Sequence, residues 1–225
     1  MSNPTLFWRF YAAVYDLIWD SPLTAALADR AATTLHGTDK SVGALTIDLG
    51  CGTGLMAARL PGNLIGVDLT PGMLRRAQHT GRITQSLLAP AEETGLQAGC
   101  ADAVLISNVL HLHPHPTAVV REGHRLCHTG TITYLWPLDE LTTDDIRTAD
   151  QETQRTGAAT AMADILRRTI SIIAGLTHPT RHTAATVEHA ALNTCTCDIT
   201  TDETLYNVQR LVSITRTPTK RCPLE

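Results

Sequence analysis

An aspartate and three glycines occupy a seven-residue stretch, Asp48 to Gly54, directly after an apolar run. Glycine lets the backbone turn sharply and lets a ligand come into contact with the main chain. We expect a helix to follow this stretch, so that the N–H groups of its first turn face the polar part of a nucleotide-like ligand. The stretch Asp-Leu-Gly-Cys-Gly-Thr-Gly is therefore predicted to be a binding loop.

The spacing of the glycines and the acidic residues around them narrow the class of ligand. The pattern is Gly-x-Gly-x-Gly, whereas dinucleotide sites carry Gly-x-Gly-x-x-Gly. Asp48 precedes the loop, and its charge would repel a pyrophosphate but attract an ammonium group. Asp68, which ends the next apolar run, can accept hydrogen bonds from both hydroxyls of a ribose. These features favour an adenosine ligand with an ammonium group over a nicotinamide dinucleotide.

These residues need a frame of strands and helices to bring them together. Between residues 45 and 136, short apolar runs alternate with amphipathic segments, which is typical of a parallel α/β sheet. The expected strands are ALTIDLG, NLIGVDL, ADAVLISNVL and GTITYLWP, and the expected helices are TGLMAARL, TPGMLRRAQHT and TAVVREGHRLC. Because parallel strands end at one edge of a sheet, the loop and Asp68 should lie close together.

The two ends of the chain are expected to add cover to this core. Residues 6–28 predict helices broken near Pro22, a second helix fills 24–35, and 142–176 is a mostly helical insertion. Two strands, TCTCDIT and YNVQRLVSITRTP, follow with a turn at TDET. We expect one domain with a helical lid over 1–40, a cofactor-binding core over 41–137, a helical cover over 138–190 and a strand pair over 191–217.

Composition and charge exclude several classes of protein. The net charge of −4 and the scattered basic residues disfavour a nucleic-acid partner. We find neither a secretory signal nor an apolar run long enough to cross a membrane, so a cytoplasmic location is expected. The six cysteines should then be reduced thiols. No metal site is expected, either at Cys195 and Cys197 or in the proline-interrupted run His111 to Pro116.

Taken with these patterns, the sequence resembles the class I S-adenosylmethionine-dependent methyltransferases, in particular a small-molecule branch similar to the ubiquinone/menaquinone methyltransferases. IDLGCGTG and GVDLTPGML match the first two motifs of that family, and APAEETGLQAGCADAVLISNVLHLHPHP follows its later layout without a gap. The resemblance implies a Rossmann-like fold with a seven-stranded, mostly parallel sheet and a C-terminal antiparallel strand. It also implies S-adenosylmethionine as the cofactor, but it does not name the methyl acceptor.

The resemblance further implies a role for individual residues. The glycine loop would lie against the methionine half of the cofactor, Asp68 would bind the ribose, and two apolar side chains after it would flank the adenine. Pro90 replaces an acidic residue of the family, which puts the contact to the adenine amino group in doubt. The implied cofactor-binding residues are Asp48, Gly50, Cys51, Gly52, Gly54, Asp68, Leu69, Met73, Ala91, Glu92, Asn108 and Tyr11.

Methyl transfer from a sulfonium needs alignment and exclusion of water, and a base helps if the acceptor is a hydroxyl or a thiol. His111 and His113 are the candidate bases, and Tyr15 is a further catalytic candidate that we expect to position the acceptor. An apolar wall made of the amino-terminal helix, the His111 to His113 loop, Trp136 and the Met162 to Ile173 helix predicts a small, hydrophobic substrate.

Two alternatives stay open from the sequence, and so does the oligomeric state. The chain could bind S-adenosylmethionine while catalysing another reaction, such as a cyclisation. It could also be a non-catalytic partner subunit, although the intact glycine loop and Asp68 speak against that reading.

Overall fold

The computed structural model describes residues 12, 14–36, 43–139, 141–153, 182–193 and 198–216. Predictions for Tyr11, for the helix Met162 to Ile173 and for Cys195 and Cys197 lie outside these residues. The elements in chain order are α2 (Tyr15–Trp19), α3 (Pro22–His36), β1 (Leu45–Leu49), η1 (Ala57–Arg59), β2 (Asn63–Asp68), α4 (Pro71–His79), β3 (Gln85–Leu88), β4 (Ala103–Ser107), α5 (Pro116–Leu126), β5 (Gly130–Pro137), α6 (Thr143–Glu152), α8 (Ala184–Leu192), β6 (Asp198–Leu205) and β7 (Gln209–Arg216).

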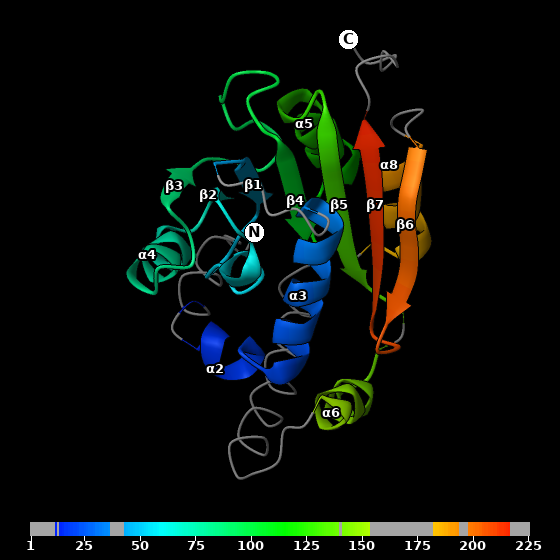
Figure 1. Ribbon diagram of the computed structural model, residues 1–225. Coiled ribbons are helices and arrows are strands. Elements are labelled where there is room, and N and C mark those ends of the chain that lie inside the picture. The colour runs from blue at the N-terminus through cyan, green and yellow to red at the C-terminus, as the bar shows by residue number, and fades with distance from the viewer. Residues whose placement is uncertain are drawn as a thin grey trace.

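The strands form one seven-stranded sheet in the order β3-β2-β1-β4-β5-β7-β6 (Figure 1). All neighbours from β3 to β5 pair in parallel, and β7 pairs antiparallel with both β5 and β6. The predicted Rossmann-like sheet with an antiparallel C-terminal strand is thus confirmed. The chain moves outward from β1 to β3 and then returns to place β4 on the other side of β1. This reversal is where open α/β sheets bind ligands.

Two layers of helices cover the sheet because the side chains of its central strands alternate between its faces. Val104 and Ile106 of β4 join the core under α5 and α8, whereas Ala103 and Leu105 join the core under α3 and α4. Figure 1 shows α3 in front of β4 and β5, with α5 and α8 behind the sheet. It also shows α2 and α6 beyond the edge toward which β4 and β5 point. Two helices thus lie at this edge among the described residues, and the lid and substrate cover stay a prediction.

The expected helix after the glycine loop is wrong. Only the short 3-10 turn η1 follows, and Leu60 is already extended with ψ 134°. Leu60 precedes Pro61, and a residue before proline avoids the helical region. Six residues between Gly54 and Pro61 leave too little chain for a regular helix, so no helix amino terminus faces a ligand here.

The C-terminal turn was also placed wrongly. Thr201 to Thr204 lie inside β6, and the chain reverses instead at Tyr206 and Asn207, both at φ 51°. The polar composition that suggested a turn belongs to an edge strand whose alternate side chains face solvent, a common protection against edge-to-edge pairing. The short strand β3 and the helix α8 were not located from the sequence.

No helix within the described ranges is long and apolar enough to cross a membrane. The cytoplasmic location stays a prediction. The described cysteines, Cys51, Cys100 and Cys127, are free thiols.

Candidate functional site

The glycine loop is a tight turn between β1 and β2, held by its own backbone. Gly50, Gly52 and Gly54 all have positive φ, at 76°, 55° and 76°, which side chains with a Cβ rarely tolerate. The N–H groups of Gly50 and Cys51 both donate to the carbonyl oxygen of Val67, and the N–H of Gly54 donates to that of Cys51. The loop therefore has a fixed shape.

Gly50 and Gly52 differ in what surrounds them. A Cβ at Gly50 would lie 2.3 Å from Cγ2 of Val109, so packing alone requires glycine there. A Cβ at Gly52 would meet no atom of the described residues within 4 Å. The backbone of Gly52 therefore borders open space, which is the property expected where a ligand contacts the main chain.

Asp68, at the end of β2, is joined to this loop. Its Oδ2 accepts from the N–H of Gly52 at 3.0 Å, and its Oδ1 accepts from the N–H of Thr70 at 2.7 Å. Burial raises the pKa of Asp68 despite these two hydrogen bonds, which act in the opposite direction. Since a carboxylate has about four acceptor positions, it can still accept from ligand hydroxyls.

Asp48, on β1, is the second carboxyl group of the site. It is 2% exposed, and its Oδ2 has no hydrogen-bond partner among the described residues. Burial and the neighbouring charge of Asp68 raise its pKa to about 7. An unpartnered carboxyl group at this depth is costly, and an ammonium group from a ligand would relieve that cost.

The electrostatics of the loop do not suit a phosphate. The N–H groups of Gly50, Cys51, Gly52 and Gly54 are already bonded within the protein, so they form no free cradle. Two carboxyl groups flank the loop instead. This arrangement fits a ligand with hydroxyls and a positive charge better than it fits a phosphate.

The apolar residues implied by the resemblance occupy different surroundings. Leu69 is 52% exposed beside Asp68, so its side chain is accessible to a ligand at that site. Met73 is only 2% exposed and packs against Ile18 of α2, so its described contacts are those of a core residue. Cys51 is buried against Gly66, and burial raises the pKa of its thiol well above the ordinary value.

Asn108 follows β4 at the same edge of the sheet, in an unusual backbone conformation. Its φ is 57°, and its N–H donates to the carbonyl oxygen of Leu135. Its Oδ1 accepts from Nε2 of Gln209 on β7 at 3.1 Å. Backbone strain of this kind is found preferentially at functional sites, and here the Gln209 contact fixes the side chain.

The two predicted histidines differ in their contacts. Nδ1 of His113 accepts from the N–H of His115 at 3.1 Å, so Nε2 carries the ring hydrogen and faces Oε2 of Glu92 at 3.0 Å. Both ring nitrogens of His113 are thereby engaged. His111 lies in the same loop and is half-buried. Ala91, next to Glu92, is buried in the core behind the sheet.

His182, which the sequence analysis missed, fastens this loop to the start of α8. Its backbone N–H donates to the carbonyl oxygen of His111 at 2.9 Å. Its ring Nε2 donates to the carbonyl oxygen of His113 at 3.0 Å. No local pattern marks this histidine, because its partners lie about seventy residues earlier in the chain.

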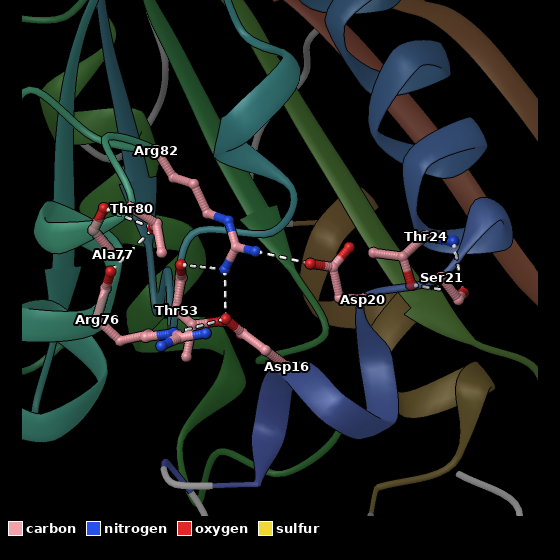
Figure 2. Close-up of polar contacts among 9 residues, drawn as sticks. All are labelled: Asp16, Asp20, Ser21, Thr24, Thr53, Arg76, Ala77, Thr80 and Arg82. Carbon is pink, nitrogen blue, oxygen red and sulfur yellow. Dashed lines mark hydrogen bonds and ion pairs between the residues drawn. The ribbon is translucent and has the colours of Figure 1, made fainter. Parts of the chain in front are cut away.

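A second group of missed residues surrounds Asp16 on α2. Figure 2 shows its carboxylate between Thr53 of the glycine loop, Arg76 of α4 and Arg82. Tyr15, the predicted positioning residue next to it, is half-buried and packs against the pair Ile18 and Met73. Within the described residues, no cluster of three or more histidine, cysteine or acidic side chains could hold a metal ion.

Comparison with known proteins agrees with this geometry. A family model described as a methyltransferase domain matches residues 47–135, from β1 to β5. The ubiquinone biosynthesis O-methyltransferase of Xanthomonas oryzae pv. oryzae is 30% identical over 105 residues, which are 43% of this chain and 44% of that protein.

Solved structures share the fold at low sequence identity. A possible histamine N-methyltransferase from Thermotoga maritima has a TM-score of 0.65 at 13% identity. The match covers 96% of this chain and 100% of the Thermotoga chain. Magnesium protoporphyrin IX methyltransferase from Synechocystis, solved with bound S-adenosylmethionine, has a TM-score of 0.51 at 15% identity, with coverages of 86% and 78%.

Residues 47–135 therefore form a methyltransferase domain, and the fold is the one that S-adenosylmethionine-dependent methyltransferases share. The cofactor that this methyltransferase domain implies is S-adenosylmethionine, and three observed features fit that group: the open face of Gly52, the unpartnered Oδ2 of Asp48 and the exposed Leu69. The chain spans less than half the length of the curated relative it matches.

Proposed function

We propose that this methyltransferase binds S-adenosylmethionine at the carboxyl ends of β1, β2 and β4 and transfers its methyl group to a small, apolar metabolite. The observation that carries the proposal is the pairing of an open glycine backbone with two carboxyl groups, the buried Asp48 and the half-buried Asp68. Such a site matches an adenosyl group joined to an amino acid, and it opposes a phosphate.

Each end of the cofactor has a matching group in this proposal. Asp68 accepts from the ribose hydroxyls while keeping Gly52 in place, and Leu69 packs on the adenine. Asp48 lies toward the ammonium of the methionine part. Gly50, Cys51 and Gly54 shape the loop, and Asn108 faces the methionine part from β4. Ala91 and Glu92 complete the adenine side, where Pro90 supplies no acidic side chain.

The cofactor supplies a methyl group activated on a sulfonium sulfur. The protein's part is then to align the acceptor with that methyl group and to exclude water, which can account for a large share of the rate. His111 is our candidate for a base that takes a proton from a hydroxyl or thiol acceptor. Because both nitrogens of His113 are engaged, we assign it to holding the loop and not to proton transfer.

We propose the chemical class of the methyl acceptor from a relative and from the helices at the carboxyl-terminal edge of the sheet. The relative from Xanthomonas is named for ubiquinone biosynthesis, which supports a small, apolar acceptor here as well. We propose that the helices α2 and α6, which lie beyond the edge toward which β4 and β5 point (Figure 1), cover the acceptor. Together with the core they would make up one methyltransferase domain.

The test is incubation of the protein with methyl-labelled S-adenosylmethionine and fractions of a metabolite extract. We expect label in a small organic-soluble product, with an equal amount of S-adenosylhomocysteine, and less label with the Asp68→Ala variant at a cofactor concentration that does not saturate it. Consumption of a substrate without label transfer would favour a non-methylating reaction. Bound cofactor with no turnover of any fraction would favour a non-catalytic subunit.

A further inference from the structure

The carboxylate of Asp16 connects the amino-terminal helix to the glycine loop. Its Oδ1 accepts from the hydroxyl of Thr53 at 2.6 Å, and its Oδ2 accepts from Nε of Arg76 and Nη1 of Arg82, each at 2.8 Å. The three donors come from the loop, from α4 and from the segment after α4 (Figure 2). One side chain of α2 therefore joins three parts of the cofactor-binding core.

Thr53 is the residue that this contact controls. It stands between Gly52 and Gly54, both at positive φ, and it is fully buried. Its hydroxyl is held by Asp16, and its carbonyl oxygen accepts from Nη1 of Arg82 at 3.2 Å. The middle of the loop is thus fixed through its side chain and its backbone together.

The loop is held from the opposite side as well. Directly before Thr53, the N–H of Gly52 donates to Asp68, the residue proposed to bind the ribose. A rotation of Thr53 would move Gly52 and loosen that hydrogen bond. The orientation of Asp68 therefore depends on Asp16 through the Gly52–Thr53 peptide, although Asp16 is on another element.

The charges of the cluster favour this arrangement. Burial alone would raise the pKa of Asp16, but hydrogen bonds from Thr53, Arg76 and Arg82 lower it below the ordinary value, so the group is a carboxylate at neutral pH. Asp20, one turn further along, receives Nη2 of Arg82 at 2.9 Å but is 59% exposed. Charged contacts of the buried kind are stronger than exposed ones.

We propose that Asp16 is a positioning residue of the cofactor site: it fixes the glycine loop through Thr53 and thereby couples the seating of α2 to cofactor binding. This inference rests on the proposed function. Asp16 acts on the ligand through other residues, and its loss should weaken cofactor affinity without removing any group assigned to touch the cofactor.

The test compares affinities for S-adenosylhomocysteine by calorimetry, well below the melting temperature of each variant. Asp16→Asn and Thr53→Val should each weaken binding by about tenfold, a typical loss for one charge-assisted hydrogen bond. The double variant should be no weaker than the weaker single one, since both act through the contact between Asp16 and Thr53. Thr53→Ser keeps the hydroxyl and should restore affinity to within about twofold of the wild type.

Two further variants separate positioning from mere stability. Arg76→Met removes the more exposed of the two arginines and should weaken binding while leaving the fold intact. Asp20→Asn, the matched control on α2, should bind within about twofold of the wild type. Hydrogen exchange should show that the ligand protects Tyr15–Trp19 and Gly50–Gly54 together in the wild type, and protects only the loop in Asp16→Asn.

The outcomes distinguish this inference from the function on which it rests. If Asp16→Asn, Thr53→Val and Arg76→Met melt at lower temperature but bind S-adenosylhomocysteine like the wild type, Asp16 is only a structural residue and the inference is wrong. If the wild type itself does not bind S-adenosylhomocysteine, the proposed function fails first, and the inference fails with it.

Discussion

The backbone N–H of Gly52 donates to Oδ2 of Asp68 over 3.0 Å. This bond joins the loop after β1 to the end of β2, which are neighbouring parallel strands in register from Leu45 to Leu49. Without this hydrogen bond, the glycine loop and Asp68 would be two unconnected parts of the surface. With it, the backbone of Gly52 and the carboxylate of Asp68 form one site whose shape exists before any ligand arrives, so little ordering is needed on binding.

Gly52→Ala should affect binding far more than it affects folding. The new Cβ meets no protein atom, so stability should fall by only about 1 kcal/mol from the strain of positive φ. The same methyl group would project into the space proposed for the cofactor, and affinity for S-adenosylhomocysteine should fall at least tenfold. Thermal unfolding and calorimetry measure the two effects.

Gly43→Ala is the matched control for this variant. Gly43 also has positive φ, at 102°, and a Cβ there would likewise meet no described atom within 4 Å, but it precedes β1, at the opposite end of that strand from the loop. It should lose similar stability and keep its affinity. Equal affinity losses in the two variants would mean that Gly52 does not face the ligand.

Asp48 should make folding and binding depend on pH in a defined direction. Its pKa is raised to about 7 from an ordinary 3.8, so between these values the folded protein holds a proton that the unfolded chain has released. The free energy of unfolding should therefore decrease as pH rises through this interval and become level above it. Asp48→Asn should flatten the profile measured by denaturant unfolding.

Binding of S-adenosylhomocysteine should also change the protonation of Asp48. An ammonium group beside Asp48 favours its charged form, so S-adenosylhomocysteine should release close to one proton on binding near pH 6. Calorimetry in two buffers with different ionisation enthalpies measures that number. Proton release of the same size in Asp48→Asn would show that another group is responsible.

The ring of His113 should be neutral with its hydrogen on Nε2, because Nδ1 accepts from the N–H of His115. Nitrogen NMR of labelled histidine should therefore show a protonated Nε2 and an unprotonated Nδ1, with the signals assigned by comparison with His113→Asn. The opposite tautomer would contradict the contact with Glu92. It would also return His113 to the candidate bases.

Much of this fold was predictable from local patterns, since apolar runs, glycines and capping residues act over a few positions. Pro71 after Thr70 correctly indicated the start of α4, and β1, β2, β4 and β5 were all found. The helix expected after Gly54 failed because Pro61 limits the chain on its far side. The strand β6 was taken in part for a turn because its polar residues suit an exposed edge as well as a turn.

Some residues of the candidate site could also be recognised from the sequence, and others could not. Asp48, the glycines and Asp68 could be recognised because their spacing along the chain carries the chemistry. Asp16 and His182 could not, because their partners are 37 or more residues away in sequence and are set only by how α2 and α8 dock. Met73 was assigned to the cofactor, but its depth under α2 became visible only in three dimensions.

Asp68→Ala should weaken S-adenosylhomocysteine binding by about 1–3 kcal/mol, the usual cost of leaving buried polar partners unpaired. The variant also loses the hydrogen bonds to Gly52 and Thr70, so its melting temperature should fall somewhat. Asp29→Ala, an acidic residue on α3 that is exposed and paired only with Arg59 at 3.7 Å among the described residues, is the control. An affinity equal to that of the wild type would remove Asp68 from the site.

The most direct test of the central claim is calorimetric titration of the unmodified protein with S-adenosylhomocysteine in the presence of a chelator. We expect one saturable binding event per chain, unchanged by the chelator and weakened by Asp68→Ala. Absence of binding to both S-adenosylhomocysteine and S-adenosylmethionine, by a protein shown to be folded, would contradict it.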